Sequence, residues 1–318
     1  MRIAYLGSGE FGLPSLQMAA ASFTLVGAVS QPDKPAGRGG KLTPTPIAAW
    51  ITEHHSALPL IKPVDVNSPE IVDVVHSWKP DLLLIIAFGQ KLSARLLGDV
   101  PAINLHASLL PRWRGAAPIN WAILGGDTTT GNSVISIAER MDAGLIYGQS
   151  RREIRPEMTA GELHDALSAD GPALVERVVR EISAGAASPI AQEESLRTRA
   201  PKLSREMARL TPEMTGEDAR RTINGLSPWP GVTASCRGAP LKLVRATRSA
   251  AVATPQGAAI RIVDPLNGIV AFGEGTTLRL LEVQPAGKRV MPWRDFANGA
   301  KLAEGEGLEF AAPGVLPS

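Results

Sequence analysis

The first half of the chain alternates short aliphatic runs with segments in which apolar residues recur at helical spacing. Uncharged aliphatic runs are typical of strands covered on both faces, and the segments between them are typical of amphipathic helices. This alternation predicts a mostly parallel sheet with helices on both faces. The predicted strands are 2–6, 24–30, 82–87 and 102–106, and the predicted helices are 13–21, 47–55, 69–78 and 159–183.

The second half has a different pattern. A short helix is predicted at 216–225, and after residue 229 short β-like runs follow, separated by Gly and Pro. These runs, at 241–245, 259–263, 268–272 and 277–283, predict a small β-barrel or sandwich. The stretch 185–200 is polar, contains small residues and is predicted to be linker. The sequence therefore predicts two domains, 1–184 and 208–318, with a linker at 185–207.

The stretch 31–46 interrupts the alternation in the first half. It contains four prolines and three glycines, and its basic residues Lys34, Arg38 and Lys41 are accompanied by one acid, Asp33. This composition predicts a long exposed loop without regular structure. Loops of that length in a compact domain are usually functional or disordered.

Composition places the chain among ordinary globular proteins. With 44% hydrophobic and 20% charged residues in 318 positions, a disordered, collagen-like or coiled-coil chain is excluded, and about two domains are expected. No apolar run approaches the ~20 residues of a membrane helix, and no signal peptide is expected. The single cysteine, Cys236, excludes an internal disulfide and a cysteine-built metal site, which fits a reducing cytoplasm.

Charge is distributed unevenly along the chain. Residues 1–200 hold 18 Lys and Arg against 20 Asp and Glu, whereas residues 201–318 hold 15 against 11. The C-terminal part is therefore mildly basic. That balance permits a nucleic-acid-binding face but does not require one.

A glycine-rich segment, GSGEFG at 7–12, follows the first predicted strand and opens the first predicted helix. It matches the G-x-G-x-x-G template for dinucleotide phosphates. The acidic partner in that motif comes about 20 residues later, near a strand end, but here Asp33 lies inside the proline-rich stretch. We therefore favour a tight strand-to-helix turn, with glycine where backbones approach closely, over a dinucleotide site.

The densest group of polar residues begins in the predicted strand 102–106. Asn104 and His106 are two residues apart, so their side chains point to the same face. They lie at the carboxyl end of the strand, the edge where open α/β sheets bind ligands. An isolated His there is more often structural, but the pair, followed by a stiff loop that contains Pro111, favours a catalytic site.

A third polar residue, Asp142, lies in a turn before Gly144. An Asp at such a position usually only stabilises the turn. Paired with His106, however, its carboxylate can orient the imidazole or accept a proton. The three residues suit the attack of an amine on an acyl or formyl carbon, because Asn and His donate hydrogen bonds to the oxyanion. No Ser or Cys lies in a recognisable nucleophile motif, so we expect direct transfer without an acyl-enzyme.

The stretch 104–118, NLHASLLPRWRGAAP, together with Asp142, resembles the formyltransferase family that uses 10-formyltetrahydrofolate. The resemblance extends over nearly the whole chain and favours the members that act on an aminoacylated tRNA. Four further segments carry it: the basic stretch 31–39, the segments 202–206 and 227–231, and the segment 284–291.

The resemblance implies a Rossmann-like formyltransferase domain, mostly parallel, followed by a small OB-like β-barrel domain. It implies formyl transfer from 10-formyltetrahydrofolate to the α-amine of methionine on initiator tRNA, with no metal and no membrane partner, by a cytoplasmic enzyme expected to be a monomer. The mild basicity after residue 200 fits a C-terminal domain that contacts phosphates. The implied site residues are Asn104, His106 and Asp142 for catalysis, Ser108, Leu109, Leu110 and Pro111 for folate, and Lys34, Arg38 and Lys41 for tRNA.

Two other functions remain open from the sequence. A related formyltransferase acting on a small amine, such as a nucleotide-sugar or a ribonucleotide amine, would share the same catalytic motif. It would need neither the basic stretch 31–46 nor a second domain, and its activity would depend little on salt. A non-catalytic nucleotide- or RNA-binding module using the 7–12 turn would leave Asn104, His106 and Asp142 without a role.

Overall fold

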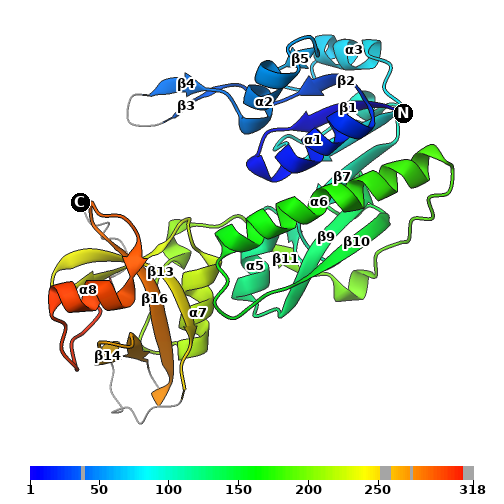
Figure 1. Cartoon of the computed structure of the whole chain (residues 1–318). Coiled ribbons are helices and arrows are strands. Elements are labelled where there is room, and N and C mark those ends of the chain that lie inside the picture. Colours follow the sequence, from blue (N-terminus) through cyan, green and yellow to red (C-terminus); the bar gives the residue numbers. More distant parts are fainter. Residues whose placement is uncertain (37–39, 251–258, 273–274, 311–318) are drawn as a thin grey trace. The chain divides into compact units, whose positions relative to one another are not determined.

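The computed structural model describes residues 1–36, 40–250, 259–272 and 275–310 (Figure 1). The chain folds into two compact units. The first contains residues 1–115, 131–152 and 164–199, and the second contains residues 116–130, 153–163 and 200–318. Two short segments of the first half thus pack in the C-terminal unit. The predicted domains 1–184 and 208–318 are continuous in sequence, whereas each compact unit of the structure combines three separate segments. The predicted domain boundaries at 184 and 208 therefore stay a prediction.

The first unit is built on a seven-stranded sheet in the order β10-β9-β7-β6-β1-β2-β5. The pairs β1–β2, β1–β6, β6–β7 and β2–β5 are parallel, and β7–β9 is antiparallel. The predicted mostly parallel sheet is therefore confirmed. Its strands are β1 Arg2–Gly7, β2 Thr24–Val29, β5 Leu60–Ile61, β6 Leu82–Ile86, β7 Ala102–His106, β9 Thr129–Ser136 and β10 Ile146–Glu153.

Helices pack against this sheet because its central strands are apolar on both faces. All five residues of β6 are buried. Successive residues of β1, such as Ile3 and Ala4, point to opposite faces and are both fully buried. The helices are α1 Leu13–Ser22, α2 Pro46–His54, α3 Pro69–Ser77, α4 Ala94–Leu97 and α6 Ala160–Ser183, with short 3-10 turns at η1 Glu10–Gly12 and η2 Glu194–Leu196.

The glycine-rich turn after β1 owes its composition to close packing. A Cβ atom on Gly7 would lie 2.6 Å from the Tyr5 ring and 2.7 Å from the carbonyl oxygen of Ile86. The buried Tyr5 hydroxyl donates a hydrogen bond to the carbonyl of Gly12. Asp33, the residue that a dinucleotide site would need, instead pairs with Lys62 at 2.7 Å. These contacts favour the tight-turn interpretation.

The stretch 31–46 does contain regular structure, so the prediction of an irregular loop was wrong. Strand β3, Lys34–Ala36, pairs antiparallel with β4, Lys41–Thr43. The high proline and glycine content of this stretch suggested an irregular loop. A two-stranded ribbon is nevertheless compatible with it, because such a ribbon needs no apolar face and proline is tolerated on edge strands. At the base of this hairpin, the Thr45 hydroxyl accepts a hydrogen bond from the Ala48 amide and caps α2.

The second unit contains an antiparallel sheet in the order β12-β13-β16-β15-β14, with β17 also paired to β16. The sheet is curled (Figure 1), which confirms the predicted small OB-like domain. Its elements are α5 Pro118–Leu124, η3 Arg205–Met207, α7 Gly216–Gly225, β12 Val232–Cys236, β13 Ala239–Arg248, β14 Arg261–Asp264, β15 Ile269–Ala271, β16 Thr277–Pro285, β17 Met291–Pro292 and α8 Trp293–Ala300. The two-residue strands β8 Arg114–Gly115 and β11 Arg199–Ala200 pair separately.

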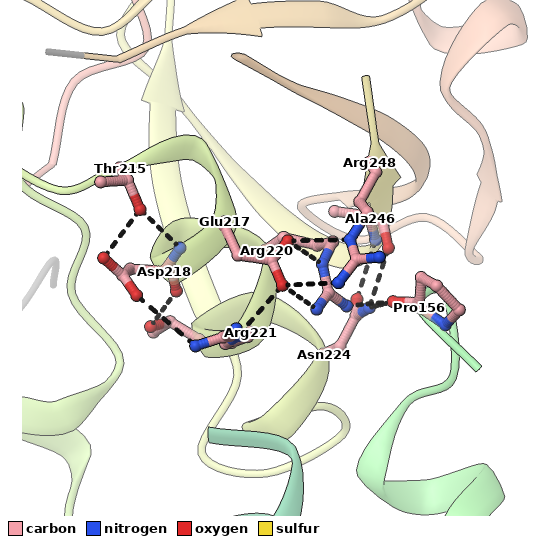
Figure 2. Close-up of polar contacts among 10 residues, drawn as sticks. Pro156, Thr215, Glu217, Asp218, Arg220, Arg221, Asn224, Ala246 and Arg248 are labelled. Atoms are coloured by element: carbon pink, nitrogen blue, oxygen red, sulfur yellow. Dashed lines mark hydrogen bonds and ion pairs between the residues drawn. The ribbon is translucent and has the colours of Figure 1, made fainter. Parts of the chain in front are cut away.

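Helix α7 is held in the second unit by a network of charged side chains (Figure 2). The guanidinium of Arg220 is 7% exposed and donates to both carboxylate oxygens of Glu217. It also donates to the carbonyl of Pro156. Arg221 and Arg248 also donate to Oε1 of Glu217, at 3.1 and 3.3 Å. The hydrogen bond from Arg220 lowers the pKa of Glu217 from 4.5 to about 2, so Glu217 stays charged.

Candidate active site

Asn104 and His106 lie at the carboxyl end of β7, as their spacing predicted. Residue 104 pairs with Ile85 of β6 on one side and with Ile135 of β9 on the other. Asn104 is half-buried, and among the described residues no hydrogen-bonding partner contacts its amide. An amide with free hydrogen-bonding capacity at this edge of the sheet is available to a substrate oxygen.

His106 is buried, and both ring nitrogens face oxygen atoms. Nε2 lies 3.0 Å from the carbonyl oxygen of Trp113. A carbonyl only accepts hydrogen bonds, so Nε2 carries the proton in this contact. Nδ1 lies 3.6 Å from Oδ1 of Asp142, close enough for a charge interaction but too long for a good hydrogen bond. The structure thus brings His106 and Asp142 together, which the sequence did not determine.

Asp142 is positioned by the loop between β9 and β10. Its φ is +53°, in the left-handed region that Asp tolerates better than most residues. Its Oδ2 accepts a hydrogen bond of 2.8 Å from the Gly115 amide. A side chain at Gly144 would collide with the backbone of Ser136, so the loop turns close to β9 only with glycine there. The hydrogen bond from Gly115 and the close turn at Gly144 therefore both hold the Asp142 carboxylate near His106.

The loop 108–111 is attached firmly to the sheet. The hydroxyl of Ser133, in β9, donates to the Ser108 carbonyl at 2.6 Å and accepts from the Leu110 amide at 3.0 Å. Gln149, in β10, donates to the Leu110 carbonyl and to the Ser133 hydroxyl. Leu110 packs with Ile135. Sequence reasoning missed Ser133 and Gln149, because their polar atoms act on backbone groups brought near only by folding.

The predicted folate residues occupy this loop. Ser108 and Leu110 are buried, whereas Leu109 and Pro111 are half-buried. The Ser108 hydroxyl donates to the carbonyl of Arg112 at 2.6 Å. The folate role of these four residues stays a prediction.

Two of the three predicted tRNA-contacting residues lie on the β3–β4 hairpin. Lys34 and Lys41 are exposed, and neither makes an ion pair with another residue of the described ranges. The nearby acid Asp33 is neutralised by Lys62. The hairpin therefore keeps its positive charge for an external anion. Arg38 lies outside the described residues.

Within the described ranges, no cluster of three or more His, Cys, Asp or Glu residues has the arrangement of a metal site. Over the same residues, no helix combines the length and apolarity required to span a membrane.

Both halves of the chain match known family models. Residues 1–179 match the formyl transferase family, and residues 202–301 match the formyl transferase C-terminal domain. The methionyl-tRNA formyltransferase of Bacillus pumilus is 38% identical over 310 residues, which cover 96% of this chain and 97% of the relative. That of Moorella thermoacetica is 36% identical, covering 96% and 98%.

Solved structures share the fold at much lower identity. The sugar 3N-formyl transferase WlaRD has a TM-score of 0.67 at 12% identity and covers 91% of this chain and 99% of that chain. HypX from Aquifex aeolicus, in complex with tetrahydrofolic acid, has a TM-score of 0.58 at 16% identity and covers 93% and 46%. Such distant similarity indicates a common architecture.

Proposed function

The chain belongs to the formyl transferase family, among its methionyl-tRNA formyltransferases, and we propose that Asn104, His106 and Asp142 carry the reaction. The chain transfers a formyl group from 10-formyltetrahydrofolate to the α-amine of methionyl initiator tRNA. The observation that supports the site assignment is that Asn104 and His106 lie two residues apart at the carboxyl end of β7, with Asp142 Oδ1 3.6 Å from Nδ1 of His106.

In the proposed mechanism the neutral methionyl amine attacks the formyl carbon, and the carbonyl oxygen becomes negative. The free amide of Asn104 donates a hydrogen bond to this oxyanion. The bond from the formyl carbon to N10 of the folate then breaks. The amine loses one proton and N10 gains one, so a group that first accepts and then releases a proton completes the reaction.

The pair of His106 and Asp142 is suited to that proton transfer. Nε2–H of His106 is held by the Trp113 carbonyl, which leaves Nδ1 and the Asp142 carboxylate to take up the proton together. The sequence also suggested a hydrogen bond from His106 to the oxyanion. That role requires the substrate to replace the Trp113 carbonyl as the acceptor of Nε2–H.

The first experiment is to incubate the purified protein with 10-formyltetrahydrofolate and methionyl initiator tRNA, and to measure formylmethionine by mass spectrometry. Methionyl elongator tRNA, free methionine and a nucleotide-linked amino sugar are the alternative acceptors. We expect product with the initiator tRNA alone. Product with the amino sugar alone would move the acceptor to a small amine, the second candidate.

The hairpin lysines give a separate prediction about tRNA binding. Changing Lys34 and Lys41 to Ala together should raise the KM for methionyl initiator tRNA about tenfold and leave the KM for folate unchanged. The slope of log affinity against log salt should become shallower by about 2, because two phosphate contacts are lost. Steady-state kinetics between 50 and 200 mM salt, roughly the range over which such contacts weaken steeply, measures both values.

The matched control for this pair is Lys79→Ala. Lys79 is also exposed, but it precedes β6 and lies at the opposite, amino-terminal end of the parallel strands. It should leave both KM values unchanged. A double variant that raised the KM for folate would instead place the hairpin at the donor site.

Three further expectations stay predictions from the sequence. They are the contact of Arg38 with tRNA, the cytoplasmic location and the monomeric state.

A further inference from the structure

The predicted linker contains a segment that returns to the candidate active site. Ile190 exchanges two backbone hydrogen bonds with Ile146, at 2.8 and 2.9 Å. Eight residues later, the Thr198 hydroxyl accepts from the Trp113 amide and the Thr198 carbonyl accepts from the Arg114 amide. Residues 190–198 are therefore fixed at one end beside β10, which follows the Asp142 loop, and at the other beside Trp113 and Arg114, in the segment that follows β7.

Gln192, in the middle of this segment, uses its whole amide group on these loops. Its Nε2 donates to the carbonyl oxygens of Asp142 and Gly144, each at 2.8 Å. Its Oε1 accepts from two nitrogens of Arg114, at 2.9 and 2.7 Å. Because a guanidinium only donates, Arg114 fixes which end of the amide faces the catalytic loop.

Arg114 in turn is buried and held in place. Its guanidinium is 7% exposed and pairs with Glu194 at 2.8 Å. The hydrogen bond from Arg114 lowers the pKa of Glu194, so the partner stays charged. The next residue, Gly115, donates its amide to the Asp142 carboxylate. Asp142 is thus held twice, its backbone through Gln192 and its side chain through Gly115.

We propose that Gln192 is a positioning residue for formyl transfer, which holds the Asp142 loop so that the carboxylate stays against Nδ1 of His106. The inference rests on the proposed function, because it assigns to Gln192 a role that acts through Asp142. The contact between Oδ1 and Nδ1 is 3.6 Å long, so a small movement of the loop decides whether the pair shares a proton. The left-handed backbone of Asp142, with φ +53°, is disfavoured for a residue other than glycine and persists where surrounding contacts hold it.

The test compares Gln192→Met with the wild-type protein. Methionine has a similar length and no donor, so the two carbonyls lose their anchor. We expect kcat to fall about 10- to 100-fold, because misplacement by about 1 Å has an effect of that order. The KM values for folate and for tRNA should stay within about threefold of the wild-type values. Within the described residues, Gln192 contacts neither the proposed folate loop 108–111 nor the β3–β4 hairpin proposed to bind tRNA.

Two further variants make the result specific. Asp142→Asn should lower kcat by itself, and in the Gln192→Met background it should lower kcat much less, because both changes act on one group. Asp170→Asn breaks an ion pair of 2.6 Å with Arg152 in the same unit. This control should leave kcat unchanged, which separates positioning from a general loss of stability measured as Tm.

Four outcomes decide the inference. A large loss of kcat in Gln192→Met, with unchanged KM values and non-additivity with Asp142→Asn, supports it. Full activity in Gln192→Met together with an inactive Asp142→Asn overturns it and leaves the proposed function intact. Equal activity of wild type and Asp142→Asn contradicts the proposed site itself. Strictly additive losses would also overturn it, because Gln192 would then act independently of Asp142.

Discussion

Replacing Asn104 by Ala is expected to lower kcat for formyl transfer by about 10²- to 10³-fold, the usual effect of removing one donor to an oxyanion. Among the described residues, the Asn104 amide has no hydrogen-bonding partner within the protein. His106, by contrast, already donates to the Trp113 carbonyl. In the proposed mechanism, Asn104 is therefore the side chain expected to donate to the developing negative charge.

The variant Asn104→Asp distinguishes this role from packing. Aspartate has nearly the shape of asparagine, but its carboxylate only accepts hydrogen bonds and repels an oxyanion. We expect Asn104→Asp to be at least as inactive as Asn104→Ala. A residue that only filled space would give the opposite order.

Steady-state kinetics at saturating tRNA and folate gives the kcat values, and a binding titration with 5-formyltetrahydrofolate checks the donor site. Donor affinity should change little, because the oxyanion exists only during the reaction. Activity of Asn104→Asp within about threefold of wild type would exclude Asn104 as an oxyanion donor.

The second large effect concerns stability. Glu217→Gln should lower the free energy of unfolding by about 3 kcal/mol at pH 7, because it leaves the buried guanidinium of Arg220 without its counter-charge. Figure 2 shows Glu217 between the arginines of the network. Arg220 keeps its hydrogen bond to Pro156 in this variant, but a neutral carbonyl does not balance a charge.

The same carboxylate predicts a dependence on pH. The pKa of Glu217 is about 2 in the folded protein and 4.5 without its partners, so the unfolded state binds the proton more readily. The stabilisation is complete above pH 4.5 and is lost as the pH falls toward 2. Over that interval the wild-type protein should lose more stability than Glu217→Gln, which has no carboxylate to protonate.

Urea unfolding followed by circular dichroism measures both effects. Glu176→Gln is the control, because Glu176 forms an ion pair of 2.6 Å with Arg180, whose side chain is 62% exposed. That surface pair should contribute less than about 1 kcal/mol. Equal losses in Glu217→Gln and Glu176→Gln would show that burial of Arg220 does not determine the effect.

Local pattern predicted those elements with a long aliphatic run or a long helical periodicity. The strands β1, β6 and β7 and the helix α6 follow directly from aliphatic runs and helical periodicity. Elements with mixed patterns were missed. β10 alternates half-buried and exposed residues along a polar sequence, and α8 is only eight residues long, so the helical spacing of Trp293, Phe296 and Ala297 spans little more than one turn. Their positions depend on the sheets they pack against.

The sequence by itself indicated the candidate catalytic side chains and determined that Asn104 and His106 share one face of β7, because strand geometry is local. It also determined the family, because the motif at 104–118 and the order of the other recognised segments can be read directly from the sequence. Only the tertiary structure decided that Asp142 meets His106, thirty-six positions away, and that Gln192 holds its loop. Those contacts join segments that are far apart in the chain, and no local pattern encodes the distance between them.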